Sequence, residues 1–254
     1  MDRERARLAI SLVDLTDLSD DCDATAVAAL CDRASRFGTA AVCVWPEFVS
    51  LAAEILGEFR ASGGPVVATV VNFPTGDERP YAVEVQTERA LADGADEIDV
   101  VLPYRAFAAG DRTRPPAVLQ AVRSATDGAA LMKVILEVGE LPDAATIARA
   151  TQFAIDHGAD FVKTSTGKSK TSASPQAVSV MLDVLAEERR TVGIKPSGGI
   201  STVGDAERYL ELAEAAMGDG WLSPRTFRFG ASGLLTALVD AAGGDEAAAA
   251  ATDD

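Results

Sequence analysis

Short apolar segments recur along the chain at fairly even spacing. Most of them are rich in valine and isoleucine and are nearly continuous in hydrophobicity. This pattern is typical of strands that are buried on both faces, as in parallel sheets. The predicted strands are residues 8–15, 40–45, 65–72, 97–103, 131–137, 161–166, 191–197 and 226–232.

Segments with helical periodicity lie between these predicted strands. Residues 24–37, for example, place Val27, Leu30, Ala34 and Phe37 at a spacing that puts them on one face of a helix. Several of the segments end close to a glycine, which is a common helix terminator. The predicted helices are residues 24–37, 47–61, 81–93, 117–126, 143–157, 175–188, 203–217 and 233–242.

The alternation of strands and helices predicts a single-domain α/β fold, a (β/α)8 TIM barrel over residues 1–242, because about 250 residues is the usual length of that fold. A doubly wound open sheet is the alternative. That fold would more often carry a glycine-rich dinucleotide fingerprint after its first strand, and none follows residues 8–15. Residues 243–254 are rich in alanine and acidic side chains, and we predict that this tail is disordered.

The composition excludes several classes of function. A formal net charge of -16 argues against binding to nucleic acid or to anionic membranes through a basic surface. Cys22, Cys31 and Cys43 show no CxxC pairing, and no cluster has metal-ligand spacing, so neither a metal nor a cofactor is expected. His157 is the only histidine, beside a glycine at a predicted helix end, which disfavours a Ser–His–Asp hydrolase. The N-terminal residues lack the apolar run of a signal peptide, and we expect a cytoplasmic protein.

Lysine is scarce, and the basic charge elsewhere is carried by arginine. A buried lysine can lose its proton and act as an amine nucleophile, whereas arginine stays protonated. Scarce lysine together with the acid excess also suggests a halophilic source, with stability that increases in molar KCl. The lysines are Lys133, Lys163, Lys168, Lys170 and Lys195.

Three of these lysines lie inside predicted strands. Lys133, Lys163 and Lys195 belong to the fifth, sixth and seventh strands, and Asp99 belongs to the fourth. Burial of these charges without partners is costly, so we expect them to face one another inside the barrel. The cluster is either a structural salt-bridge network or a Schiff-base site. In the second case one lysine is kept unprotonated and attacks a carbonyl carbon, while the aspartate handles protons.

Glycine-containing loops follow the sixth, seventh and eighth predicted strands. They contain Gly167 and Lys168, then Gly198 and Gly199, and finally residues 230–233. Backbone N–H groups of such loops bind phosphate, and the loops after the last two strands are the usual phosphate site of a (β/α)8 barrel. The sequence therefore predicts an anionic, phosphorylated ligand.

These residues resemble a known family, deoxyribose-phosphate aldolase. The resemblance extends from about Asp14 to Leu238, and the strings around Lys163 and Lys195 are highly specific to that family. Residues 103–106 are further similar to its bacterial branch, typified by the enterobacterial enzyme. The segments that carry the resemblance are residues 94–101, 133–137, 159–168, 192–199 and 229–235.

The resemblance implies a class I aldolase that needs no metal. Such an enzyme cleaves 2-deoxy-D-ribose 5-phosphate reversibly to acetaldehyde and D-glyceraldehyde 3-phosphate, in deoxyribose phosphate catabolism. By the family pattern, Lys163 forms the Schiff base with C1 of the sugar. Lys195 lies beside Lys163, lowers its pKa and takes part in the proton relay. Asp99, acting through water, deprotonates the C3 hydroxyl so that a carbon–carbon bond breaks.

The resemblance also implies a set of substrate-binding residues and a possible homodimer. Ser201 stands where many relatives carry an arginine near the phosphate, so phosphate affinity is expected to differ. The tail also lacks the terminal tyrosine that some relatives fold over the site. The implied binding residues are Lys168, Gly167, Gly198, Gly199, Ser232 and Gly233 for the phosphate, with Asp14, Thr16, Cys43 and Lys133 lining the site.

Two alternatives remain open on the sequence. One is another Schiff-base barrel aldolase of the transaldolase or fructose-bisphosphate type, which shares the lysine of the sixth strand but not the string of residues 195–199. The other is a catalytically silent phosphosugar-binding barrel. Binding alone does not need two neighbouring lysines, and treatment with substrate and borohydride separates the classes.

Overall fold

A closed barrel of parallel strands forms the centre of the molecule. The computed structural model describes residues 1–126 and 128–244. Within these residues one eight-stranded parallel sheet has the order β7-β6-β5-β4-β3-β2-β1-β8, and bridges between Ile194 and Phe227 and between Ser197 and Gly230 join its two ends. The (β/α)8 barrel is therefore confirmed, and the open-sheet alternative is wrong. The strands are β1 (Val13–Asp17), β2 (Ala41–Val44), β3 (Val66–Val71), β4 (Glu97–Val101), β5 (Leu131–Ile135), β6 (Phe161–Lys163), β7 (Gly193–Lys195) and β8 (Phe229–Ala231).

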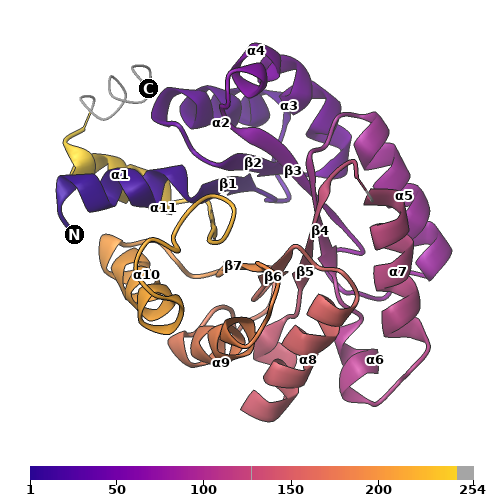
Figure 1. Cartoon of the computed structure of the whole chain (residues 1–254). Coiled ribbons are helices and arrows are strands. Elements are labelled where there is room, and N and C mark those ends of the chain that lie inside the picture. Colours follow the sequence, from indigo (N-terminus) through magenta and orange to yellow (C-terminus); the bar gives the residue numbers. More distant parts are fainter. Residues whose placement is uncertain (127, 245–254) are drawn as a thin grey trace.

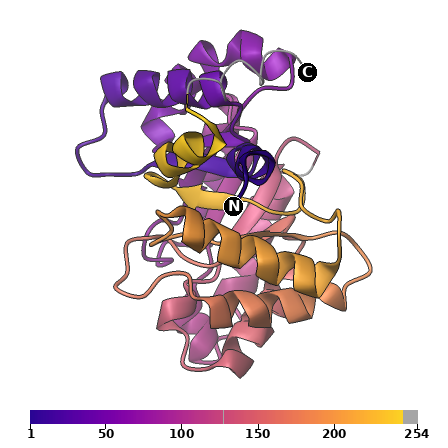
Figure 2. The ribbon, with the colours of Figure 1, turned by 90° about the vertical axis from the view of Figure 1, so that its left-hand side faces the viewer.

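Helices surround the barrel as an outer layer (Figure 1), and the view from the side shows them flanking the strands (Figure 2). No helix among the described residues is both long and apolar enough to span a membrane. The helices are α1 (Arg3–Ser11), α2 (Ala24–Phe37), α3 (Val49–Ile55), α4 (Gly57–Ala61), α5 (Pro80–Ala92), α6 (Tyr104–Ala108), α7 (Arg114–Thr126), α8 (Ala144–Asp156), α9 (Pro175–Ala186), α10 (Val203–Met217) and α11 (Leu234–Ala242), with the 3-10 turns η1 (Pro46–Phe48) and η2 (Val138–Glu140).

The first predicted strand is wrong at its start, because residues 8–11 belong to helix α1. Asp2 caps this helix through a hydrogen bond from the backbone N–H of Arg5. Ala6, Ala9 and Ile10 are buried, at the spacing of one helical face, and α1 packs against α11. A short apolar run does not distinguish a helix from a strand, and here the contact with a distant helix decides.

Two further local expectations differ from the structure. Residues 47–61 do not form one helix but divide into η1, α3 and α4. Helix α3 is separated from α4 at Leu56 and Gly57, and glycine is a poor helix former. Helix α6 has only five residues, which is too short for its periodicity to be recognised. Its position after β4 leaves the barrel order unchanged.

Alternation along the strands sorts the side chains into two layers. Val42 and Val44 belong to the large core between strands and helices, whereas Ala41 and Cys43 belong to a separate small cluster. Since neighbouring residues of a strand point to opposite faces, the small cluster lies inside the barrel.

The expected domain boundary stays a prediction. Helix α11 ends at Ala242, and most of the predicted tail, residues 245–254, lies outside the described residues.

Candidate active site

Three lysines from neighbouring strands converge on the carboxylate of Asp99. The Nζ atoms of Lys163 and Lys195 lie 2.7 and 2.8 Å from its Oδ2, and Nζ of Lys133 lies 2.9 Å from its Oδ1. The strand register explains the meeting, because Asp99 pairs with Lys133 across β4 and β5, and Lys163 pairs with Lys195 across β6 and β7. The structure thus brings together the charged residues that the sequence placed inside strands.

A further group of charged side chains continues this cluster inside the barrel. Asp14 accepts from Nη1 of Arg228 at 2.5 Å and lies 2.5 Å from Nζ of Lys195. Glu97 accepts from Nη2 of Arg228 at 2.8 Å and lies 2.5 Å from Nζ of Lys133. Asp14 also lies 3.6 Å from Nζ of Lys133, so the two carboxylates link the arginine to both lysines.

Sequence reasoning omitted Glu97 and Arg228. A signal for both was present, because each is a charged residue inside a predicted apolar strand. Glu97 also lies two positions before Asp99, and residues two apart on a strand share a face. The criterion that selected Lys133 applies equally to this pair. Their partners, however, come from strands far apart in the sequence.

Burial and neighbouring charge act differently on the three lysines. Burial lowers the pKa of Lys163 below its ordinary value, and the ammonium of Lys195 adds to this against the attraction of Asp99. Burial also lowers the pKa of Lys195, but the carboxylates of Asp14 and Asp99 outweigh it, so that its pKa is raised. The pKa of Lys133 is raised as well, because Asp99 and Glu97 outweigh burial. Lys163 is therefore the buried lysine that most readily becomes a neutral amine.

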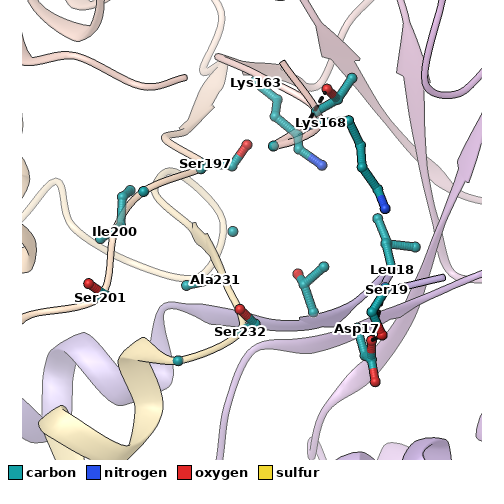
Figure 3. Close-up of a pocket in the computed structure, with 17 residues that line it drawn as sticks. Asp17, Leu18, Ser19, Lys163, Lys168, Ser197, Ile200, Ser201, Ala231 and Ser232 are labelled. Carbon is teal, nitrogen blue, oxygen red and sulfur yellow. Dashed lines mark hydrogen bonds between the residues drawn. The ribbon is translucent and has the colours of Figure 1, made fainter. Parts of the chain in front are cut away.

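A cavity of about 420 Å³ opens at the carboxyl ends of the strands beside Lys163. In Figure 3 the side-chain nitrogen of Lys163 points into this hollow. Lys133 and Lys195 are completely buried and do not line it. The volume suits a small phosphorylated sugar. The lining residues are Thr16, Asp17, Leu18, Ser19, Lys163, Thr166, Gly167, Lys168, Ser197, Gly198, Gly199, Ile200, Ser201, Gly230, Ala231, Ser232 and Gly233.

The loops at the mouth of the cavity present backbone groups. Gly198 and Gly199 have φ values of 88° and 76°, a left-handed conformation that favours glycine. Gly233 precedes the first residue of α11, so the amino end of this helix lies at the cavity. Consecutive N–H groups and helix amino ends are suited to anions. Ser201 lines the same region.

Lys168 extends from the loop after β6 to the opposite side of the cavity. Figure 3 shows its side chain running toward Leu18 and Ser19. Its Nζ lies 3.1 Å from Oδ1 of Asp20 and 5.6 Å from the centre of the Trp45 ring. Because Asp20 is 95% exposed, the pair is a weak surface contact that a stronger anion can displace.

Glu137 supports this loop and was not foreseen from the sequence. It is buried at the end of β5, and its φ of 53° is unusual for a residue other than glycine. Its carboxylate accepts hydrogen bonds from the hydroxyls of Thr166 and Ser169, at 2.5 and 3.1 Å. It therefore holds the segment that carries Gly167 and Lys168.

The remaining residues implied by the resemblance occupy different depths. Thr16 lines the cavity, whereas Asp14 and Lys133 belong to the buried charged cluster and Cys43 to the small apolar cluster. Burial raises the pKa of the Cys43 thiol, which keeps it neutral. Among the described residues no group of three or more His, Cys, Asp and Glu side chains could hold a metal ion.

Comparison with known proteins places this chain among aldolases. The DeoC/LacD family aldolase description matches residues 8–238. The chain is 49% identical over 252 residues to the deoxyribose-phosphate aldolase of Agrobacterium fabrum strain C58, covering 98% of this chain and 96% of the relative. It also resembles a crystal structure from Toxoplasma gondii, provisionally named a deoxyribose-phosphate aldolase, with a TM-score of 0.86, 28% identity and 94% of each chain covered.

A tetrameric deoxyribose phosphate aldolase from Aeropyrum pernix has a TM-score of 0.76 and 24% identity, with 93% of this chain and 95% of that chain covered. At this level of identity the likeness concerns the fold alone.

Proposed function

The chain belongs to the DeoC/LacD aldolase family, and from this premise we propose that it cleaves 2-deoxy-D-ribose 5-phosphate reversibly to D-glyceraldehyde 3-phosphate and acetaldehyde. The observation that carries the proposal is Lys163, a buried lysine with a lowered pKa whose amine faces a cavity of about 420 Å³. A neutral amine in such a place is suited to attack a carbonyl carbon. A transaldolase-like enzyme would share this lysine, but the 49% identity to a deoxyribose-phosphate aldolase favours the proposed reaction over it. A silent binding barrel would have no use for a neutral amine that faces the cavity.

The reaction follows from the position of Lys163. Its amine adds to the C1 aldehyde of the open-chain sugar, and loss of water gives a protonated imine. Removal of the proton from the C3 hydroxyl breaks the C2–C3 bond, since acetaldehyde keeps C1 and C2. The bonding electrons move to the imine and leave an enamine, while glyceraldehyde 3-phosphate departs. Protonation of the enamine at C2 and hydrolysis release acetaldehyde and the free lysine.

Asp99 and Lys195 are the proposed proton-handling groups. The carboxylate of Asp99 contacts the amines of both Lys163 and Lys195, at 2.7 and 2.8 Å. Asp99 is buried and does not line the cavity, so in this proposal a water molecule carries the C3 proton to it, and Lys195 keeps a positive charge beside the nitrogen of Lys163. This charge supports the catalytic role of Lys163 because it disfavours a second ammonium next to it.

We assign the phosphate to the cavity mouth, with Lys168 as its charged partner. Lys168→Gln is expected to lower kcat/KM for the phosphorylated sugar about tenfold, because one charge-assisted hydrogen bond is lost. The value for unphosphorylated 2-deoxyribose should change little. The measurement is the ratio of kcat/KM for the two sugars in each variant.

Lys170→Gln is the matched control for this prediction. Lys170 is an exposed lysine of the same loop that does not line the cavity. Asp20→Asn is expected to leave the ratio unchanged or to raise it, since it removes the surface partner of Lys168. Equal losses for both sugars in Lys168→Gln contradict the assignment.

The proposed function is tested by a coupled assay for glyceraldehyde 3-phosphate release, combined with borohydride trapping. Substrate plus borohydride should inactivate the enzyme irreversibly and leave a mass increment on Lys163. Activity should survive a chelator, because the proposed mechanism uses no metal. Release of product without any adduct contradicts the Schiff base. The absence of both product release and adduct contradicts the aldolase proposal itself.

The setting of the enzyme is proposed from its composition and from the family resemblance. We assign it to the cytoplasm, and we propose that it forms a homodimer. Light scattering of the purified chain tests the dimer, and a tetramer, as in the relative from Aeropyrum pernix, contradicts it. The formal net charge of -16 also suits a salt-rich cell interior. The free energy of unfolding is therefore expected to increase from dilute buffer to molar KCl, and a decrease contradicts the salt adaptation.

A further inference from the structure

Arg228 and Glu97 form a buried contact at the base of the charged cluster. Arg228 is 5% exposed and Glu97 is 2% exposed. The guanidinium of Arg228 donates from Nη2 to one oxygen of Glu97 at 2.8 Å and from Nη1 to Asp14 at 2.5 Å. Neither residue lines the cavity, so neither is placed to touch a substrate.

Two chains of contacts lead from Arg228 to Lys163. One runs through Asp14 and Lys195, and the other through Glu97 and Lys133. Both lysines then meet at Asp99, whose Oδ2 also contacts Lys163. A change of charge at Arg228 or Glu97 is therefore transmitted through buried ionic contacts rather than through water.

The charges of this cluster do not balance when every group is ionised. Among the described residues that meet in it, cations outnumber anions by one. An excess charge is costly in a buried environment, and loss of one proton from a lysine removes the excess. The cations are Lys133, Lys163, Lys195 and Arg228, and the anions are Asp14, Glu97 and Asp99.

We propose that Arg228 and Glu97 are positioning residues for the aldolase reaction, because their opposite charges determine whether Lys163 is the neutral member of the buried cluster. The inference rests on the proposed Schiff-base function of Lys163. Together with the two other lysines of the cluster, Arg228 supplies three cations that balance the three carboxylates. Lys163 is then the group that stays neutral. Glu97 has the opposite effect, because it adds a carboxylate that favours an extra proton.

The surroundings of Lys163 are consistent with this arrangement. Burial lowers the pKa of Lys163, while the pKa values of Lys133 and Lys195 are raised by carboxylates that outweigh burial. The barrel wall adds Cys43 from β2, a thiol kept neutral by burial, and β3 adds apolar Ala68 and Val70. At the mouth, Asp17 and Lys168 line the cavity with opposite charges.

The test uses two substitutions that change the charge in opposite directions. Arg228→Met leaves three lysines for three carboxylates, so Lys163 should keep its proton to higher pH. Glu97→Gln leaves three other cations for two carboxylates, so Lys163 should lose its proton at lower pH. The acid limb of kcat/KM against pH should move up in the first variant and down in the second, by about one pH unit each.

The double variant Glu97→Gln/Arg228→Met restores the balance and should return the acid limb close to that of the wild type. The conservative variant Arg228→Lys keeps the charge but not the simultaneous hydrogen bonds to Asp14 and Glu97. The acid limb of its pH profile should therefore stay at the wild-type position. Borohydride trapping of the acetaldehyde imine across the same pH range reports the amine of Lys163 without the later steps. Thermal unfolding of each variant identifies those that are folded.

A merely structural role for Arg228 and Glu97 gives a different outcome. Folded variants then lose activity without opposite shifts of the acid limb, and this result overturns the inference. If Arg228→Met does not fold, Glu97→Gln still predicts a downward shift and Arg228→Lys predicts none, and failure of either contradicts the inference. Absence of any imine trapped in the wild type instead overturns the proposed function.

Discussion

Lys163→Arg is expected to abolish turnover of 2-deoxy-D-ribose 5-phosphate, with a loss of kcat of about 10⁵-fold or more, as in other enzymes deprived of a covalent nucleophile. Arginine keeps its proton at every working pH and cannot form the imine. The substitution also retains a cation that can contact Asp99, which Lys163 approaches to 2.7 Å. The measurements are kcat in the coupled assay and the mass increment after borohydride reduction with substrate, which should disappear.

Lys170→Arg is the control for the loss of a lysine, since Lys170 lies exposed in the loop that follows Lys163. It should keep wild-type turnover and full trapping. Thermal unfolding of Lys163→Arg shows whether the barrel has survived the substitution. Substantial activity in a folded Lys163→Arg protein contradicts the assignment of the nucleophile, and an adduct on another lysine would identify its replacement.

Asp99→Asn is expected to reduce kcat by about 10²–10⁴-fold, the range of a lost general acid–base group. The carboxylate accepts from three lysines at 2.7 to 2.9 Å, and an amide can neither balance their charge nor take a proton. Removal of one partner from a buried ionic contact also destabilises a protein by about 3–5 kcal/mol. Both kcat and the free energy of unfolding should therefore decrease.

The pH dependence of stability distinguishes the ionic role of Asp99. Burial would raise its pKa, but the surrounding lysines outweigh burial and hold it well below the ordinary range. Its stabilising contribution is thus fully present above the unfolded-state pKa of about 4, and is lost as the pH falls toward the folded-state value. Asp99→Asn should therefore show a weaker loss of stability on acidification than the wild type.

Glu97→Gln is the matched comparison for Asp99→Asn. Glu97 lies on the same strand and face, is also buried, and loses the same charge. It does not contact Lys163, and the loss of kcat at the optimum pH should be much smaller than in Asp99→Asn. Similar losses in both variants contradict a direct proton-handling role for Asp99 and favour a purely electrostatic one.

The barrel could be predicted because its signals are local. Apolar runs such as residues 65–72 and 97–103 and the helices between them recur at the spacing of a (β/α)8 fold. The errors arise where the local signal is too weak to distinguish a strand from a helix. Residues 8–11 are apolar enough for a strand, and only the packing of α1 against α11 makes them helical. A short run carries too little periodicity to settle such a case.

The candidate site could be predicted in part, and its predicted roles stay proposals. Lys163 and Lys195 stand out as charged residues in apolar strands, and glycine loops follow them. The sequence did not reveal Glu137, because a glutamate at the end of a strand is ordinary until its hydrogen bonds to Thr166 and Ser169 are seen. Lys168 was expected at a phosphate, and the structure adds its contact with Asp20.

By itself, the sequence determined which strands carry charged residues and that Lys163 lies among apolar neighbours next to a glycine loop. Only the tertiary structure decided that Lys163, rather than Lys133 or Lys195, faces the cavity. It also decided that Arg228 meets a carboxylate from β1 and one from β4. The physical reason is closure of the barrel, which brings distant strands together, whereas periodicity reports only the local direction of a side chain.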